Sequence, residues 1–224
     1  MSPIKALVSL AVVAGAVFAG FFFQAKTPTD TPETSGNFDF WVLSLSWSPT
    51  FCAGQDNPDS VQCNGDKRWG FIVHGLWPQY ESGYPSDCQM GPERIDYRFA
   101  EEMADLIPSP PLVFHQWRKH GRCTGMTPEA YFAATRNAAE RVTIDPSFSP
   151  QRTSRQSPDE IEARFTAVND GMKTEGLAVT CRSGMLQDVR ICLDKSLEFR
   201  ACREVDADAC TAREIALPAA TDRP

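Results

Sequence analysis

Residues 69–78 read WGFIVHGLWP, an apolar run that carries a histidine and ends in a proline. A run of this length and composition is typical of a buried strand, and we expect His74 to lie at the end of that strand. A second short stretch, residues 114–123 (FHQWRKHGRC), holds the other two of the chain's three histidines. This stretch predicts a helical turn that Gly121 stops.

Three residues of the second stretch are expected on one helix face. Gln116, Lys119 and His120 stand at positions i, i+3 and i+4, which are neighbours on a helix surface. Trp117 and Arg118 then point elsewhere, and we expect Trp117 in the core. A strand-borne imidazole facing a second imidazole, a lysine and an amide predicts an acid–base site with charge stabilisation.

The composition is that of a globular, exported protein with disulfides. Of the 224 residues 42% are hydrophobic, and eight are cysteines with no CxxC pair among them. An even number of cysteines behind an apolar leader favours disulfides over zinc ribbons or redox motifs. The net charge of −7 makes the chain a poor general partner for a polyanion. If the substrate is nucleic acid, local clusters such as Arg118-Lys119 must bind it.

The N-terminal 37 residues are expected to lie outside the folded domain. Residues 1–25 contain an apolar run from Ala6 to Phe23 and predict a signal peptide or, if uncleaved, an N-terminal anchor. Residues 26–37, rich in Thr and Pro, predict a linker. Either reading places the folded part outside the cytoplasm, secreted or periplasmic, with no stable membrane partner unless the leader is retained.

The remaining pattern predicts an α+β fold with a central antiparallel or mixed sheet and helices grouped mid-chain. Alternating residues predict a strand over Phe38–Trp47, followed by a polar loop from Cys52 to Asp66. Thr127-Pro128 and the capping box at Ser157 each start a helix. These two helices are expected to run to about residues 142 and 169. A further helix is expected over 95–107, and strands over 177–181, 189–193 and 197–202.

The three histidines leave two chemistries open, acid–base catalysis and a metal site. A zinc hydrolase could hold its metal with three histidines. His115 and His120 stand at i, i+5, whereas chelating pairs on a helix prefer i, i+4. The spacing therefore favours acid–base catalysis.

Both motifs resemble the two active-site segments of the ribonuclease T2 family. The matching segments are FIVHGLWP at 71–78 and HQWRKHGRC at 115–123. Residues 38–52 are similar to the family's first strand, and residues 103–109 are similar to the segment before its second motif. The resemblance implies one ribonuclease T2-like domain over 38–215, a disulfide-stapled monomer that uses no cofactor.

The resemblance implies endonucleolytic cleavage of single-stranded RNA without metal, through a 2′,3′-cyclic phosphate. By correspondence His120 is the base, His74 the acid and Lys119 the group that stabilises the phosphorane. His115 would bind phosphate. Trp77 would stack on a base, with Tyr84 or Tyr80 on its other face. Because the 2′-OH is the nucleophile, DNA is expected to be inert.

Three positions depart from the family pattern. Gln116 stands where the family usually has a glutamate, Gln79 where it often has an acidic residue, and Arg122 where it often has a threonine. We keep Gln116 in the catalytic set. Its presence also leaves open a catalytically inactive homologue that binds RNA or a protein partner. A metal-dependent phosphoesterase is the other alternative.

The resemblance and the local order of the cysteines also imply a disulfide pairing. Eight cysteines allow about 105 pairings, so spacing alone does not choose one. The pairs expected are Cys52–Cys63, Cys88–Cys123, Cys181–Cys210 and Cys192–Cys202. The second pair would tie the loop after His74 to the end of the histidine helix.

Overall fold

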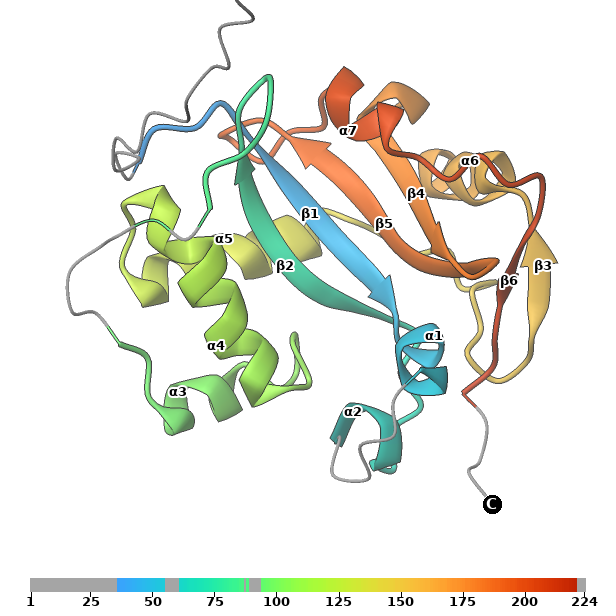
Figure 1. Cartoon of the computed structure of the whole chain (residues 1–224), viewed down its shortest axis with the longest axis horizontal. Helices are drawn as coiled ribbons and strands as arrows, with labels where there is room; N and C mark the ends of the chain where they lie inside the picture. Colours follow the sequence, from blue (N-terminus) through green and yellow to red (C-terminus); the bar gives the residue numbers. More distant parts are fainter. Residues whose placement is uncertain (1–35, 55–60, 87, 89–93, 221–224) are drawn as a thin grey trace, which may run out of the picture. The chain divides into compact units, whose positions relative to one another are not determined.

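A computed structural model describes residues 36–54, 61–86, 88 and 94–220. Within these residues six strands form one mixed sheet with the order β2-β1-β5-β6-β3, in which β4 also pairs with β5 (Figure 1). All pairings are antiparallel except that of β5 with β6. The strands are β1 (Phe40–Trp47), β2 (Phe71–Gln79), β3 (Ser154–Gln156), β4 (Leu177–Arg182), β5 (Met185–Leu193) and β6 (Ile215–Leu217). The expected leader and most of the expected linker lie outside the described residues.

The first strand, β1, separates two different environments. Its odd-numbered side chains, Trp41 to Trp47, lie in the main hydrophobic core, as the alternation predicts. Its even-numbered residues are buried as well, but Phe40 and Val42 belong to a smaller apolar cluster with Cys192, Cys202 and Val205. Ser44 and Ser46 continue that second face. Two small polar residues therefore follow the second cluster along the strand.

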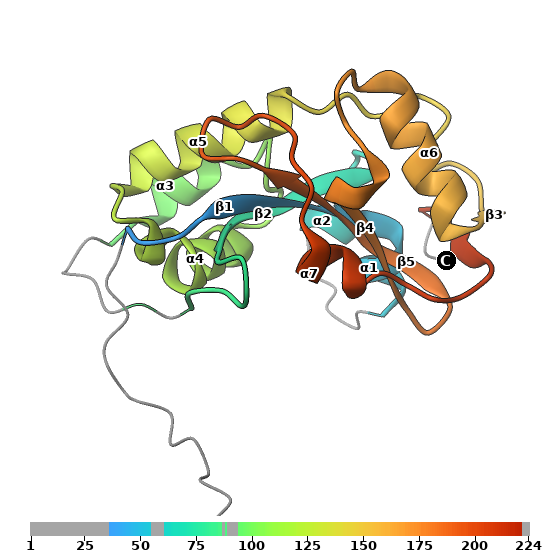
Figure 2. The ribbon, with the colours of Figure 1, turned by 90° about the horizontal axis from the view of Figure 1, so that it is seen from above.

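The helices cover the two faces of the sheet unequally. Figure 2 shows α5 and α6 over one face and α7 on the other. Thr127 caps α5 by accepting a hydrogen bond from the Ala130 amide, and Ser157 opens α6 with a complete capping box, as predicted. The helices are α1 (Ser48–Ala53), α2 (Val61–Asn64), α3 (Tyr97–Glu102), α4 (Pro110–Lys119), α5 (Pro128–Glu140), α6 (Pro158–Val168) and α7 (Arg203–Ala207), with short 3₁₀ turns at Gly121–Thr124 and Thr174–Gly176.

All four expected disulfides are present. The pairs are Cys52–Cys63, Cys88–Cys123, Cys181–Cys210 and Cys192–Cys202. Cys123 lies in the 3₁₀ turn directly after α4, so its bond to Cys88 ties the end of the histidine helix to the chain that follows β2. The α+β class, the mixed sheet and the disulfides are thus confirmed.

Several expected elements differ in extent or kind. The helix expected over 95–107 is only α3 at 97–102. The amides of Met103, Ala104 and Leu106 donate to carbonyls three residues back, so the chain continues in tight turns instead of α-helix. The loop expected from Cys52 to Asp66 contains α2. Residues 197–202 form no strand: Leu197 has a φ of +66°, and only Phe199 bridges to Leu193. The Cys192–Cys202 bond closes this fold-back.

Two short strands had no clear signal in the sequence. β3 and β6 have three residues each and pair only over that length. Three residues are too few to establish an alternation that differs from a loop. Among the described helices none is both long enough and apolar enough to span a membrane.

Candidate active site

His74 lies in the middle of β2 and not at its end, which corrects the expectation from sequence. The β1–β2 register pairs Ser44 with Gly75 and Leu45 with Val73, so His74 is the extra residue of a β-bulge. A bulge redirects a side chain without ending the strand. β2 continues to Gln79 through Pro78, and a proline is tolerated there because β2 is an edge strand of the described sheet.

The helix α4 ends where the sequence predicted a stop. Lys119 is its last residue, and His120 follows at the C-cap, with its amide donating to the Gln116 carbonyl at 3.0 Å. At Gly121 a Cβ would come within 2.3 Å of the Trp117 ring and 2.9 Å of the Tyr131 ring. Only glycine allows the chain to turn this closely against both rings.

The indole of Trp77 connects the two motifs. Its Nε1–H donates to the Gln116 Oε1 at 2.9 Å. Its ring stacks on His120 with centroids 5.3 Å apart and meets His74 edge-on at 5.7 Å. At Gly75 a Cβ would lie 1.9 Å from the Gln116 Oε1, so a glycine is needed beside this hydrogen bond. The two imidazoles therefore contact one shared aromatic ring.

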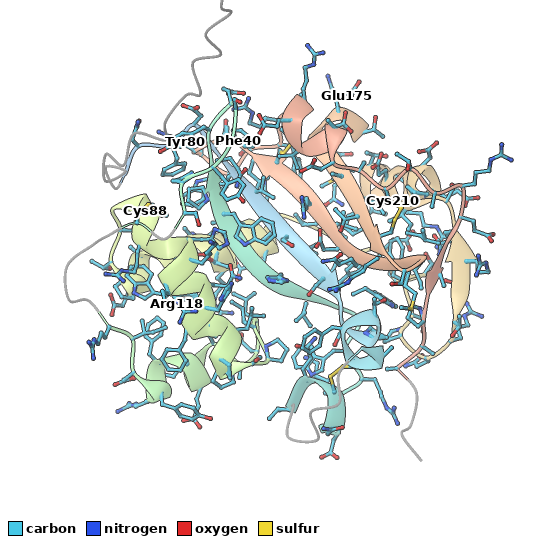
Figure 3. The ribbon with its side chains drawn as sticks, in the orientation of Figure 1. Phe40, Tyr80, Cys88, Arg118, Glu175 and Cys210 are labelled. Atoms are coloured by element: carbon cyan, nitrogen blue, oxygen red, sulfur yellow. A yellow bond between two sulfur atoms is a disulfide. The ribbon has the colours of Figure 1, made fainter. Side chains whose placement is uncertain are left out.

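Gln116 is the most deeply buried polar residue of the helix face, with 1% of its surface exposed. Its carbonyl oxygen accepts from Trp77, whereas its amide nitrogen is buried and has no hydrogen-bond partner within the described part of the chain. A buried donor without a partner is costly unless a ligand satisfies it. Gln116 and Lys119 lie on α4 as predicted, whereas His120 is the C-cap residue just outside the helix. Trp117 lies in the core. Arg118 is exposed and labelled on α4 in Figure 3.

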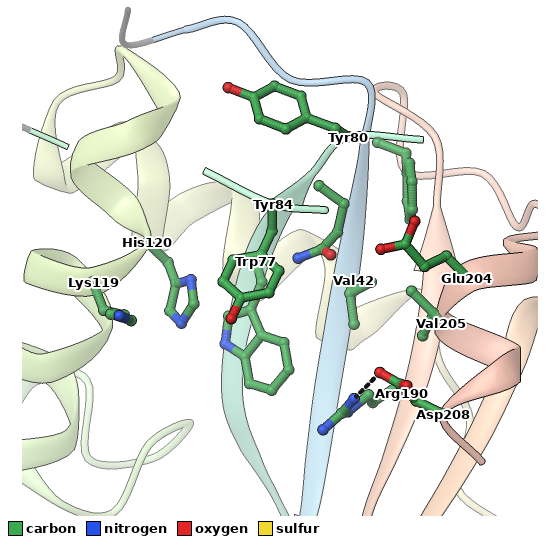
Figure 4. A pocket seen from close by; sticks show the side chains of 12 residues that line it. Val42, Trp77, Tyr80, Tyr84, Lys119, His120, Arg190, Glu204, Val205 and Asp208 are labelled. Carbon is green, nitrogen blue, oxygen red and sulfur yellow. Dashed lines mark ion pairs between the residues drawn. The ribbon is translucent and has the colours of Figure 1, made fainter. Parts of the chain in front are cut away.

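A cavity of about 410 Å³ opens beside Trp77 and brings together residues from both motifs. Figure 4 shows Lys119 and His120 on one side of Trp77, and Arg190 with the α7 region on the other. The predicted aromatic Tyr84 lines the cavity and is 58% exposed, and Tyr80 lines it as well. The remaining lining residues are Phe40, Val42, Gln79, Glu204, Val205 and Asp208.

His74 lines a second cavity, of about 330 Å³, on the same face of the sheet. Ser46 of β1 and Asp188 of β5, which are paired in register, form part of its wall. Thr50 also lines it, with a buried hydroxyl that has no partner among the described residues. Val42 in the first cavity and Ser46 in the second are even-numbered residues of β1, so both cavities open on the face opposite the main core.

The charges around His74 act in opposite directions. Burial lowers the pKa of the His74 imidazole below its ordinary value of 6.5, and this is the largest effect. The Asp188 carboxylate raises that pKa, whereas the nearby His115 and Arg190 lower it. His115 is exposed on α4 and lines neither of these two cavities. The electrostatic effect of His115 on His74 nevertheless places His115 near His74.

Asp188, Arg190 and Glu204 are site residues that sequence reasoning missed. Arg190 Nε donates to Asp188 Oδ1 at 3.1 Å, and Arg190 also pairs with Asp208 at 3.8 Å, the ion pair drawn in Figure 4. Its guanidinium lies 5.6 Å from the centre of the Trp77 ring. The sequence did carry a signal for two of them. Asp188 and Arg190 stand at and beside the start of the apolar run 189–193, which predicts a buried strand.

No three-histidine metal site is formed in the described part of the chain. Groups of three or more His, Cys, Asp or Glu side chains that could hold a metal ion do not occur among these residues. His120 stacks on the Trp77 ring, and His74 meets the same ring edge-on. The described residues thus offer no ligand set for the zinc alternative.

Comparisons with known proteins find ribonucleases similar to this chain. A ribonuclease of Aeromonas hydrophila is 41% identical over 118 residues, which cover 53% of this chain but only 51% of that relative. Ribonuclease DdI of Dictyostelium discoideum is 26% identical over 232 residues, covering 94% of this chain and 96% of its own length. The chain thus spans about half the length of the first relative and nearly all of the second.

Comparisons with solved structures find proteins of the same fold. Trichomaglin, described as an S-like ribonuclease, superposes with a TM-score of 0.68 at 22% identity, covering 83% of this chain and all of that one. The RNase-related protein from Calystegia sepium gives a TM-score of 0.66, also at 22% identity, covering 81% of this chain and 98% of its own. The model of the Ribonuclease T2 family matches residues 38–202. The chain belongs to the ribonuclease T2 family.

Proposed function

We propose that the chain is a metal-independent endoribonuclease that cleaves single-stranded RNA by transesterification through a 2′,3′-cyclic phosphate. The observation that carries the proposal is the shared contact of His74 and His120 with Trp77, with Lys119 and His120 lining one cavity beside that ring. An imidazole side chain can both accept and donate a proton in the physiological pH range, as a base and an acid for this reaction must. Family membership supports RNA as the substrate.

The proposed reaction divides the proton transfers between the two histidines. His120 removes the proton from the ribose 2′-OH, and the 2′-oxygen attacks the phosphorus. His74 gives its proton to the departing 5′-oxygen as the P–O5′ bond breaks. Lys119, in the cavity with His120, stabilises the negative charge on the phosphorane. The unpaired amide nitrogen of Gln116 is a donor that a phosphoryl oxygen would satisfy, and His115 adds positive charge for phosphate binding.

Trp77, Tyr80 and Tyr84 are the proposed stacking surfaces for a base in the larger cavity. Stacking on an aromatic ring tolerates every base. DNA lacks the 2′-OH nucleophile, so it is not cleaved. We further propose that the protein acts outside the cytoplasm, secreted or periplasmic, as a monomer. The pairing of all eight cysteines in disulfides supports an oxidising compartment.

The second candidate is a catalytically inactive homologue that binds RNA or a protein partner. The observation in its favour is Gln116, an amide at a position where the family usually has a carboxylate. The amide still orients Trp77 through a hydrogen bond of 2.9 Å, so the site geometry persists without the carboxylate. Activity measurements must therefore separate the two candidates.

The test is incubation of the purified chain with single-stranded RNA and with DNA of the same sequence, each in excess EDTA, with the product ends analysed. We expect RNA fragments that end in a 2′,3′-cyclic phosphate and intact DNA. A His120→Ala protein, purified in the same way, controls for contaminating ribonuclease. Cleavage abolished by EDTA and restored by zinc would support the metal-dependent phosphoesterase. RNA binding without cleavage would support the inactive homologue.

A further inference from the structure

The strand β5 contributes a buried ion pair to the candidate site that the proposed reaction does not use. Asp188 has a side chain that is 3% exposed, and that of Arg190 is 25% exposed. A carboxylate buried to this extent is costly unless a charge partner and hydrogen bonds compensate it. Arg190 provides one hydrogen bond at 3.1 Å. The position of the pair beside two histidines suggests a functional reason for this cost.

The sheet register brings Asp188 and His74 to one cavity, which Ser46 of the strand between them also lines. Asp188 pairs with Ser46 of β1, and Ser46 pairs in turn with Ile72 of β2, two residues before His74. The bulge directs His74 into the cavity that Ser46 and Asp188 also line. Ser46 of β1, a small side chain that stands in register with Asp188, lines this cavity, so no large side chain of β1 at this position fills it.

Arg190 connects the carboxylate to the other half of the site. Arg190 stands two residues after Asp188 in β5. It lines the cavity of Lys119 and His120 and lies over the Trp77 ring. The ion pair therefore orders charge along the sheet, with the carboxylate beside His74 and the guanidinium beside Trp77. Position 116, next to the Trp77 indole on α4, carries no charge. The one buried carboxylate of this arrangement thus stands on the side of His74.

We propose that Asp188 is a positioning residue that shares a cavity with His74, orients its ring and favours its imidazolium form, which a general acid needs. The inference rests on the proposed function, because it assumes that His74 protonates the leaving group. A carboxylate beside an imidazole favours the imidazolium, so Asp188 counteracts the effect of burial. The other charged or titratable groups that face His74 are Arg190 of β5, His115 of α4 and Arg182, which lines the same cavity. Asp188 is the only carboxylate among these groups in the described residues.

The test is an NMR titration of the three histidine rings combined with the pH profile of kcat/KM on RNA. Asp188→Asn keeps the shape of the side chain and an oxygen that can accept from Arg190. We expect the pKa of His74 to fall, and the alkaline limb of the profile to move to lower pH with it. The loss of kcat/KM above that limb should be on the order of tenfold. Asp170→Asn, which removes one exposed carboxylate elsewhere, should change neither quantity.

A double variant guards against a folding defect of the single one. Asp188→Asn/Arg190→Gln removes the pair as a unit and leaves no charge buried alone. The pKa of His74 should still be below that of the wild type, because Asp188 affects it more strongly than Arg190 does. An unchanged pKa of His74 in both variants would overturn the proposal, as would a shifted pKa with an unmoved alkaline limb. A wild type that does not cleave RNA would instead overturn the proposed function, whatever the titration shows.

Discussion

His74 and His120 contact the same indole from structurally different supports. His74 is the extra residue of a bulge in a strand, with the Asp188 carboxylate in its cavity. His120 is the C-cap of a helix whose neighbouring residues at the site are an amide and a lysine. The Asp188 carboxylate favours the imidazolium of His74 and so opposes the effect of burial, which suits the proposed acid. The difference between the two supports is the basis for proposing opposite roles for two chemically identical groups.

The largest expected effect is the loss of either imidazole. His74→Ala and His120→Ala should each lower kcat/KM on RNA by about a hundredfold to ten-thousandfold, the usual contribution of a positioned acid or base. His115→Ala should mainly raise KM, because its proposed role is phosphate binding and it takes part in neither proton transfer. Steady-state kinetics on a short RNA measure both. An equal loss in all three variants would remove the distinction between the acid–base pair and His115.

A methyl group at Gly75 should disturb the link between the two supports. In Gly75→Ala the added Cβ would lie 1.9 Å from the Gln116 Oε1 and would force the Trp77–Gln116 hydrogen bond apart. A displacement of about 1 Å in a site can cost about a hundredfold in rate. Gly54→Ala is the steric control: it adds the same methyl group in the wall of the His74 cavity, but its Cβ would meet nothing closer than 3.8 Å. A Gly75→Ala enzyme as active as this control would show that the hydrogen bond does not hold the site together.

A carboxylate at position 116 should reduce the contrast between the two sides of the site. In Gln116→Glu a negative charge next to His120 favours its imidazolium and should raise its pKa, so the proposed base loses its proton only at higher pH. The acidic limb of the kcat/KM profile should move upward while the enzyme remains active. Gln151→Glu adds the same charge at an exposed loop position and should leave the profile unchanged. An unmoved acidic limb in Gln116→Glu would mean that residue 116 does not sense the base.

The pH dependence of the wild type follows from the environment of His74. A general acid must be protonated, and burial lowers the pKa of this one below 6.5. Activity should therefore fall as the pH rises through that lowered pKa, which gives the enzyme an acidic optimum. The pH profile of kcat/KM from pH 4 to 9 checks this, and an alkaline limb well above neutral pH would contradict it.

The smallest expected effect on activity comes from the disulfide behind the helix. Replacing both Cys88 and Cys123 with Ser opens a loop of 35 residues and should cost about 4 kcal/mol in the chain-entropy model. Removing Cys52–Cys63, with a separation of 11, should cost about 3 kcal/mol. Only the first change loosens the segment after His120, so only it should lower kcat/KM, by a few fold. Equal activities of the two folded variants would show that the bond serves stability alone.

The sequence predicted the strand of the first motif, the helix that carries Gln116 and Lys119, and the disulfides, because these depend on residues close together or on a family pattern. It placed His74 at a strand end because an apolar run shows no sign of a bulge, which arises from the register with β1. Asp188 was missed for a related reason. Its proximity to His74 comes from the pairing of three strands, and the order of strands in a sheet is not written in any one of them.

The most direct test of the division of roles uses a substrate whose leaving group needs no proton. Uridine 3′-(p-nitrophenyl phosphate) requires a base for its 2′-OH but releases p-nitrophenolate without an acid. His74→Ala should therefore cleave it within about tenfold of the wild-type kcat/KM, whereas His120→Ala should lose about a hundredfold or more. The opposite result, an inactive His74→Ala with a nearly unaffected His120→Ala, would contradict the assignment of the acid to the strand and the base to the helix.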